Sequence, residues 1–198
     1  FAPAVAGLGS HTITYTLCGT PCTFTIIVSA VPTAAIAITE TSGTNANDGI
    51  LCAGADATLT ASGGGTCLWS TGETTTSISV NTAGSYSVVV TNNGCSATAT
   101  ATITVNPLPT AGIVVTETSG IANNDGIVCA GAAVQLAASG GGTYLWSAAG
   151  NPTAATIAVL PPATTTYTVT VTNGNGCTAT ASTTITVNPL PSTPNITI

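Results

Sequence analysis

The sequence predicts an all-β protein built from tandem antiparallel β-sandwiches. Thr and Val, which favour strands, alternate with small residues over many short segments. Gly, Asn and Pro separate these segments at intervals of about 8–12 residues, as expected for the turns of a sandwich. A polar, Gly-rich segment, 40–54, recurs 77 residues later as 117–131. Repetition at a fixed spacing indicates repeated structural units.

Composition excludes several classes of partner. The chain of 198 residues contains no Lys or Arg, six acidic residues and one His, so its formal net charge is −6. Proteins bind nucleic acid and anionic lipid surfaces through cations, so we expect no nucleic-acid partner and no membrane partner. No run of apolar residues is long enough to span a bilayer as a helix.

Residues 1–31 are expected to be the last part of such a unit. The segments 11–16 and 22–28 alternate in polarity around a Gly-containing turn, which predicts a β-hairpin. Cys22 matches Cys95 of the next unit, whereas Cys18 matches no later cysteine. We expect a disulfide between Cys18 and Cys22; alternatively, Cys22 pairs with a cysteine upstream of this chain.

Residues 32–109 are expected to form the first complete unit. Its strands are expected at 35–39, 57–61, 66–70, 76–80, 85–90 and 95–105, with the polar segment 40–54 after the first of them. Asn92-Asn93-Gly94 is a strong hairpin signal, because Asn-Gly readily adopts the positive φ angles of tight turns. The motif Asn106-Pro107-Leu108-Pro109 predicts a short, stiff linker at the end of the unit.

Residues 110–191 repeat this plan. Trp146 corresponds to Trp69 and Tyr167 to Tyr86, and we expect both Trp side chains to pack between the sheets. The spacing between equivalent cysteines grows from 77 to 82 residues, and most of this difference falls in a longer excursion at 148–162. Residues 192–198 resemble the first strand of a further unit and are alternatively a donor strand for another molecule.

The motifs resemble a known repeat family. Each unit combines Cys-x-Gly before a strand, Leu-Trp-Ser, a Tyr in an alternating strand, a Gly-Cys turn and Thr-Val-Asn-Pro-x-Pro. This combination resembles the tandem immunoglobulin-like repeats of large adhesins displayed by gliding-type Gram-negative bacteria. The resemblance implies Ig-like β-sandwiches, secretion, and display at the cell surface or in an extracellular filament. Tyr86 precedes Cys95 by nine residues rather than the two of antibody domains, so we expect no tyrosine corner.

Seven cysteines in a β-rich repeat protein suggest disulfides and an oxidising compartment. We predict the pairs Cys52–Cys95 and Cys129–Cys177, each contributing about 4 kcal/mol through the chain entropy of the unfolded state.

Cys67 is left over, because Tyr144 occupies its position in the second unit. Cys67 and Trp69 are two residues apart on a predicted strand and therefore face the same side. Two alternatives are open for Cys67: a buried free thiol beside Trp69, or a disulfide to another chain.

The repeated polar segment is a candidate Ca²⁺ site, since Ca²⁺ prefers carboxylate and amide oxygens in flexible loops. The alternative is ordinary turn chemistry, in which Asp-Gly forms a tight turn and Glu ends a strand. The candidate ligands are Glu40, Asn45, Asn47, Asp48, Glu117, Asn124 and Asp125.

We expect no enzymatic activity. His11 is the only His, and no Ser–His–Asp or Cys–His set recurs between the units. The first functional hypothesis is a non-enzymatic extracellular stalk or filament subunit that self-associates, with β-strand addition as one means of assembly. The alternative is an adhesin module that binds a glycan or a host surface. Rows of Thr such as 98, 100, 102 and 104 are either a candidate glycan-facing array or the solvated face of a strand.

Overall fold

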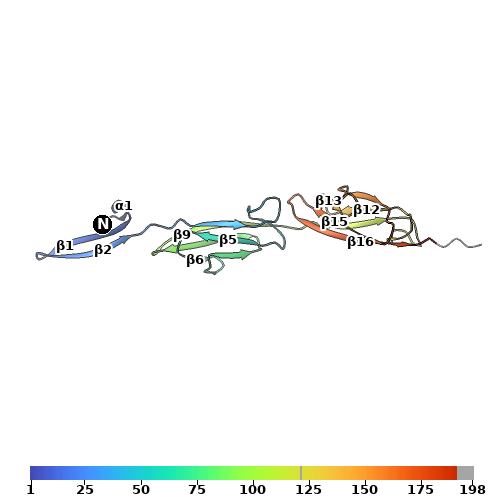
Figure 1. Ribbon diagram of the computed structural model, residues 1–198. Coiled ribbons are helices and arrows are strands. Elements are labelled where there is room, and N and C mark those ends of the chain that lie inside the picture. The colour runs from blue at the N-terminus through green and yellow to red at the C-terminus, as the bar shows by residue number, and fades with distance from the viewer. Residues whose placement is uncertain (121, 191–198) are drawn as a thin grey trace, which may run out of the picture. The chain divides into compact units, whose positions relative to one another are not determined.

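The computed structural model describes residues 1–120 and 122–190 (Figure 1). It contains a β-hairpin and two β-sandwiches, which are described one by one. Two compact units are distinguished, the first with residues 1–41 and 46–105 and the second with residues 42–45 and 106–198. No helix in the described part of the chain is long and apolar enough to cross a membrane.

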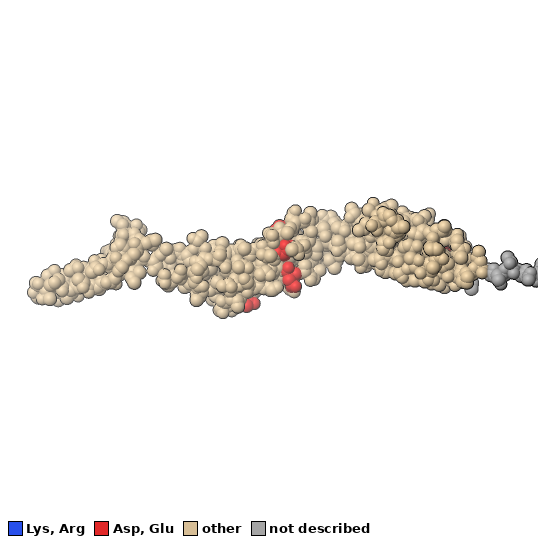
Figure 2. All heavy atoms as spheres, in the orientation of Figure 1, with Lys and Arg blue, Asp and Glu red and all other residues tan. Residues whose placement is uncertain are grey.

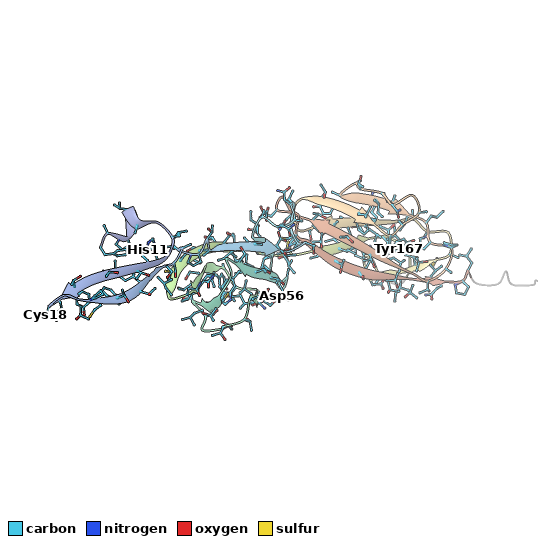
Figure 3. The ribbon with its side chains drawn as sticks, turned by 60° about the vertical axis from the view of Figure 1, so that its left-hand side comes forward. His11, Cys18, Asp56 and Tyr167 are labelled. Carbon is cyan, nitrogen blue, oxygen red and sulfur yellow. The ribbon has the colours of Figure 1, made fainter. Side chains whose placement is uncertain are left out.

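The N-terminal part is a two-stranded hairpin. A four-residue helix, α1 (Pro3–Ala6), precedes β1 (Gly9–Leu17), which pairs antiparallel with β2 (Thr20–Val28). Cys18 and Gly19 form the turn with φ angles of 50° and 83°, the positive values that a two-residue hairpin loop requires. The expected hairpin is present, and Cys18 lies at its tip (Figure 3).

The first sandwich has seven strands in two sheets. One sheet has the order β3 (Ala35–Thr39), β5 (Ala57–Ser62), β7 (Ser77–Val80). The other has the order β4 (Ile50–Cys52), β9 (Cys95–Asn106), β8 (Gly84–Asn92), β6 (Thr66–Trp69).

The second sandwich repeats this topology. Its three-stranded sheet has the order β10 (Gly112–Thr116), β12 (Val134–Ser139), β14 (Thr156–Val159). Its four-stranded sheet has the order β11 (Ile127–Cys129), β16 (Thr178–Asn188), β15 (Thr165–Thr172), β13 (Thr143–Trp146).

This strand order is that of an Ig-like sandwich. In Ig nomenclature, the three-stranded sheet corresponds to strands A, B and E, and the four-stranded sheet corresponds to a split first strand followed by G, F and C. The short strand β11 runs parallel to the last strand β16, with Ile127 opposite Thr186 and Cys129 opposite Asn188. The predicted all-β class and its Ig-like sandwiches are confirmed, with one short strand per sandwich that the sequence analysis treated as part of a loop.

Each sandwich encloses its own apolar core. Trp69 and Trp146 are only 2% and 1% exposed. Their indole N–H groups donate to backbone carbonyls of the following loop, Trp69 Nε1 to Thr75 O at 2.8 Å and Trp146 Nε1 to Ala154 O at 3.0 Å. Both rings therefore pack in the core with their polar atom satisfied, as the sequence predicted.

The added residues of the second sandwich lie in its loops. The connection after the Trp strand has residues 147–155 where the first sandwich has 70–76, and the next connection has 160–164 where the first has 81–83. Each connection gains two residues, and the turn before Cys177 gains one, which accounts for the five-residue rise in spacing from 77 to 82. The hydrogen bonds of the two sheets are thereby left undisturbed.

Tyr86 corrects one expectation. Its hydroxyl donates to the backbone carbonyl of Thr82, four residues upstream, at 3.0 Å, and lies 2.8 Å from the Thr82 hydroxyl. This is the hydrogen bond of a tyrosine corner, which we did not expect from the spacing between Tyr86 and Cys95. The corner depends on the position of the Tyr at the start of strand F and not on its distance from a cysteine.

Candidate functional site

The polar segment of the first sandwich is held by its own carboxylates. Glu40 directly follows β3 and is buried, and its Oε1 accepts a hydrogen bond from the backbone N–H of Asp48 at 3.1 Å. Asn47 Oδ1 accepts from the N–H of Glu40 at 3.1 Å, and Asp48 Oδ1 accepts from the N–H of Ile50 at 2.8 Å. Each acidic side chain thus bonds to the backbone of the loop to which it belongs.

The second sandwich contains the same network. Glu117 Oε1 accepts from the N–H of Asp125 at 3.2 Å, and its Oε2 accepts from the N–H of Ser119 at 2.8 Å. Asn124 Oδ1 accepts from the N–H of Glu117, and Asp125 Oδ1 accepts from the N–H of Ile127, at 3.0 and 2.8 Å. The contacts recur at equivalent positions, so the repeated sequence encodes a repeated hydrogen-bonded loop.

These contacts favour turn chemistry over a metal site. Asn47 and Asn124 adopt φ angles of 64° and 63°, the left-handed conformation that Asn tolerates in turns. Among the described residues, no group of three or more His, Cys, Asp or Glu side chains could hold a metal ion. Asn45 is exposed at the surface of its loop. Figure 2 shows few acidic atoms on an otherwise uncharged surface. Calcium binding at these loops therefore stays a hypothesis that only a metal-removal experiment tests.

The cysteines differ from the sequence prediction. Cys52 and Cys177 are disulfide-bonded cysteines, whereas Cys18, Cys22, Cys95 and Cys129 are free thiols. The predicted pairs Cys52–Cys95, Cys129–Cys177 and Cys18–Cys22 are therefore wrong in this structure.

The sheet register explains why Cys129 and Cys177 cannot pair. Cys129 lies opposite Asn188 at the end of β16, whereas Cys177 directly precedes the first residue of that strand. The eleven residues from Cys177 to Asn188 span about 36 Å at about 3.3 Å per residue. A disulfide requires Cα atoms within about 7 Å.

The same register separates Cys52 from Cys95 in the first sandwich. The N–H of Thr104 donates to Gly49 O at 2.9 Å, which places the start of β4 beside the C-terminal half of β9. Cys95 opens β9, nine residues before Thr104, or about 30 Å away.

Cys67 is a buried free thiol in the first core cluster together with Trp69. This cluster also includes Val88 and Val90 of β8, the adjacent strand of the same sheet, where Val90 lies opposite Cys67. This environment is that of a small apolar core residue. Tyr144, which replaces Cys67 in the second sandwich, is only partly buried against its own core.

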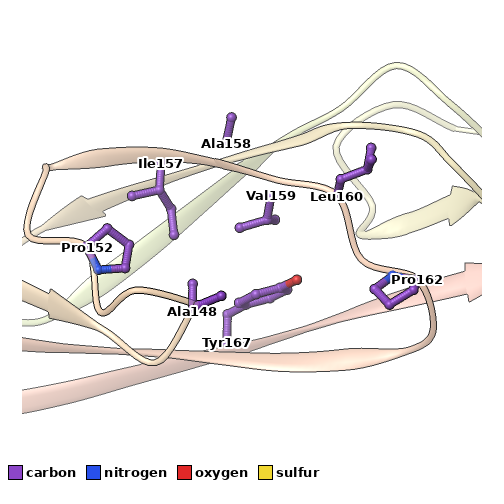
Figure 4. Close-up of a pocket in the computed structure, with 9 residues that line it drawn as sticks. Ala148, Pro152, Ile157, Ala158, Val159, Leu160, Pro162 and Tyr167 are labelled. Atoms are coloured by element: carbon purple, nitrogen blue, oxygen red, sulfur yellow. The ribbon is translucent and has the colours of Figure 1, made fainter.

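The longer loops of the second sandwich line an apolar groove that the sequence analysis did not predict. Its volume is about 550 Å³ (Figure 4). Tyr167, Ile157 and Val159 come from the sandwich, and the inserted loops contribute Ala148, Ala149, Pro152, Leu160 and Pro162. Burial raises the pKa of Tyr167, although a hydrogen bond with Thr165 acts in the opposite direction. The excess of apolar residues at 148–162 was the signal for this groove.

The hairpin presents an apolar face to solvent. The side chains of His11, Ile13, Tyr15 and Leu17 alternate with Thr along β1 and share one face with those of Cys22, Phe24, Ile26 and Val28 on β2. Tyr15, Phe24 and Leu17 are 53%, 50% and 66% exposed. The equivalent face of β8 in the first sandwich is closed by the second sheet, where Val88 and Val90 are at most 1% exposed.

The opposite strand faces are polar. Thr98, Thr100, Thr102 and Thr104 are exposed along β9. In the second sandwich, hydroxyls pair across the sheet, Thr166 with Thr184 at 2.9 Å and Thr168 with Ser182 at 2.8 Å. These rows have the arrangement of a solvated outer face, in which neighbouring hydroxyl groups satisfy one another.

His11, the only His in the chain, has a structural contact. Its Nε2 lies 2.9 Å from the carbonyl oxygen of Gly7, and its ring lies 5.7 Å from that of Phe1 (Figure 3). Both contacts hold α1 against the start of the hairpin.

Comparisons with known proteins find similarity only among solved structures. No family model matches the sequence, and no curated protein matches it. A Ca²⁺-stabilised adhesin that helps an Antarctic bacterium bind ice has 19% identity and a TM-score of 0.47, over 92% of this chain and 57% of that chain. A 1.5-MDa bacterial ice-binding adhesin has 20% identity and a TM-score of 0.36, over 81% and 66% of the two chains. The eight N-terminal Ig domains of Down Syndrome Cell Adhesion Molecule have 13% identity and a TM-score of 0.35, over 94% and 27%.

The chain thus spans 27% of the Down Syndrome Cell Adhesion Molecule structure and 57% of the structure of the Antarctic adhesin. Identities below 25% and TM-scores below 0.5 do not transfer a function. The Ig-like assignment rests on the strand order and on the Trp-centred core of each sandwich.

Proposed function

We propose that this chain is a non-enzymatic extracellular structural protein, a tandem-repeat stalk or filament subunit of a bacterial surface. The observation that supports this proposal is the half-exposed apolar face of the hairpin β1–β2. An isolated two-stranded hairpin is at best marginally stable in water. In both sandwiches, the equivalent strand pair has a further strand on each edge. In the described part of the chain, no further strand pairs with either edge of the hairpin, and its apolar face stays half exposed.

A second copy of the chain is the partner that we propose for this face. Covering Tyr15, Leu17 and Phe24 would bury about 300 Å² of apolar surface, or about 7.5 kcal/mol at about 25 cal/mol per Å². Association itself costs about 4–15 kcal/mol, so apolar contact alone is marginal. Main-chain hydrogen bonds along the open edges of the hairpin, as in β-strand addition, would supply the remainder. The expectation that residues 192–198 donate such a strand concerns a segment outside the described residues and stays a prediction.

Assembly is tested on the full chain by electron microscopy and sedimentation velocity. Tyr15→Asp and Phe24→Asp place a charge on the apolar face, and we expect both variants to remain single particles under conditions in which the unchanged protein forms fibres. Thr14→Asp and Thr23→Asp are the matched controls, because these residues lie opposite each other on the Thr face of the hairpin. Single particles for the unchanged protein, or equal loss of fibres in all four variants, would contradict the proposal.

The alternative function is an adhesin module that binds a glycan or a host surface. The groove beside Tyr167 favours it, because this groove is built from loops that differ between the two sandwiches, and variable loops on a rigid sandwich often bind ligands. A glycan array separates the alternatives: a signal that is lost in Tyr167→Ala but retained in Tyr86→Ala would favour the adhesin.

A further inference from the structure

The hairpin and the two sandwiches carry cysteines at two recurring strand positions, which define two classes. Cys52 and Cys129, the short-strand cysteines, end β4 and β11, and the carbonyl of each accepts a hydrogen bond from the N–H three residues later, at 2.9 and 3.0 Å. Cys22, Cys95 and Cys177, the last-strand cysteines, lie at or near the start of the last strand of the hairpin and of each sandwich.

The structure shows how one cysteine of each class is used. Cys52, a short-strand cysteine, and Cys177, a last-strand cysteine, are both disulfide-bonded. The remaining members of both classes, Cys129 on one side and Cys95 and Cys22 on the other, are free thiols and are only partly buried. Each class thus contains one cysteine that is disulfide-bonded and at least one equivalent cysteine that is a free thiol.

We propose that Cys129 forms an intermolecular disulfide with a last-strand cysteine, Cys95 or Cys22, of a second copy of this chain. Cys129 matches Cys52 in strand, register and carbonyl hydrogen bond. Within its own sandwich the sheet register keeps it about 36 Å from the last-strand cysteine, so its partner comes from another unit. This inference rests on the self-association proposed above and adds a covalent bond to it.

The chemistry is a thiol–disulfide exchange. The two cysteines lose their Sγ–H protons and two electrons, one S–S bond forms, and a low-molecular-weight disulfide such as oxidised glutathione is reduced to two thiols. The reaction requires an oxidising compartment, as expected for an extracellular protein. Cys67 does not compete, because it is buried in the core.

The test is non-reducing gel electrophoresis of the full chain after incubation with oxidised glutathione. We expect a ladder of bands at multiples of about 19.0 kDa that collapses to the monomer with dithiothreitol. The ladder should disappear in Cys129→Ser and in the double variant Cys22→Ser/Cys95→Ser. It should persist in the double variant Cys18→Ser/Cys67→Ser, which removes the two cysteines outside both classes. Pepsin digestion and mass spectrometry then identify the joined peptides, because the chain has no Lys or Arg for trypsin.

Three outcomes would overturn the inference: no ladder, a ladder that persists in Cys129→Ser, or a joined peptide containing Cys18 or Cys67. Electron microscopy with and without dithiothreitol separates this result from the assembly proposal. Fibres without a ladder would overturn the disulfide and leave self-association standing. Single particles without a ladder would overturn both.

Discussion

Replacing Glu117 by Ala is expected to destabilise the second sandwich and leave the first unchanged. The Glu117 carboxylate is buried and accepts two backbone hydrogen bonds, from Ser119 at 2.8 Å and from Asp125 at 3.2 Å. A hydrogen bond to a charged group contributes about 1.5–3 kcal/mol. Both donors lie in a loop where water can partly replace the lost acceptor, so we expect a total loss of about 2–4 kcal/mol rather than the full sum.

Glu117→Gln is a milder substitution at the same position. Its amide retains one acceptor oxygen but places an NH₂ group against the second backbone N–H. We therefore expect a loss of about 1–2 kcal/mol, between the unchanged protein and the Ala variant. Glu73→Gln is the matched control, because Glu73 is fully exposed, and its replacement should change the stability of neither sandwich.

Hydrogen exchange read on peptic peptides measures each sandwich separately. In the exchange regime governed by equilibrium opening, a loss of about 2–4 kcal/mol speeds exchange by roughly 30- to 700-fold. We expect this acceleration in peptides from β12 and β15 of Glu117→Ala, whereas peptides from β5 and β8 serve as the internal reference. Exchange in β12 and β15 that is accelerated less than about threefold would refute the role of Glu117 as the acceptor that holds this loop.

Four further outcomes are expected. Tyr86→Phe removes the hydrogen bond to Thr82 O and should cost the first sandwich about 1 kcal/mol in denaturant unfolding; no loss would mean that water replaces this bond. Gly142→Ala should cost about 3 kcal/mol, because a Cβ there collides with the Thr172 carbonyl oxygen. Gly141 also has a positive φ, of 74°, but a Cβ there meets open space, so Gly141→Ala should cost about 1 kcal/mol; equal costs would contradict the collision. Burial raises the pKa of the Tyr167 hydroxyl above 10.0, so the folded state holds this proton more tightly than the unfolded state does. The free energy of unfolding should therefore be unaffected below about pH 10 and decrease as the pH rises further. Tyr167→Phe should reduce this decrease; an unchanged dependence of stability on pH would contradict the role of Tyr167. Melting temperatures with CaCl₂ and with EDTA should be equal if the loops need only their own hydrogen bonds; a higher value with CaCl₂ would instead support the calcium hypothesis.

The sandwich fold was predictable because its signals are local. Alternation of Thr and Val, the Asn-Gly turn at 93–94 and the two Trp residues each report on a few neighbouring positions. The five added residues were also placed largely correctly, because insertions fall in loops and the Trp and Tyr positions bracket them.

The cysteine pairs were not predictable from the same signals. The pair Cys129–Cys177 looked reasonable in the sequence because both complete units carry a cysteine at each of these two positions. The three-residue strand β11, however, runs parallel to the end of β16 and moves Cys129 to the far end of the sheet. Such a short strand carries almost no alternation, so its pairing is set by tertiary contacts alone.

The acidic loop of the second sandwich and Cys129 form one structural arrangement. Glu117 Oε2 accepts from the N–H of Ser119, and the hydroxyl oxygen of Ser119 accepts from the N–H of Cys129 at 3.4 Å. The buried carboxylate therefore fixes, through one serine, the backbone of the cysteine that we propose to join two molecules. If this connection matters, Glu117→Ala should slow formation of the disulfide ladder as well as weaken the sandwich. Ser119→Ala, which breaks only the second step, should slow the ladder with a smaller effect on stability. The Glu117 carboxylate would then serve to present a thiol rather than to bind a metal.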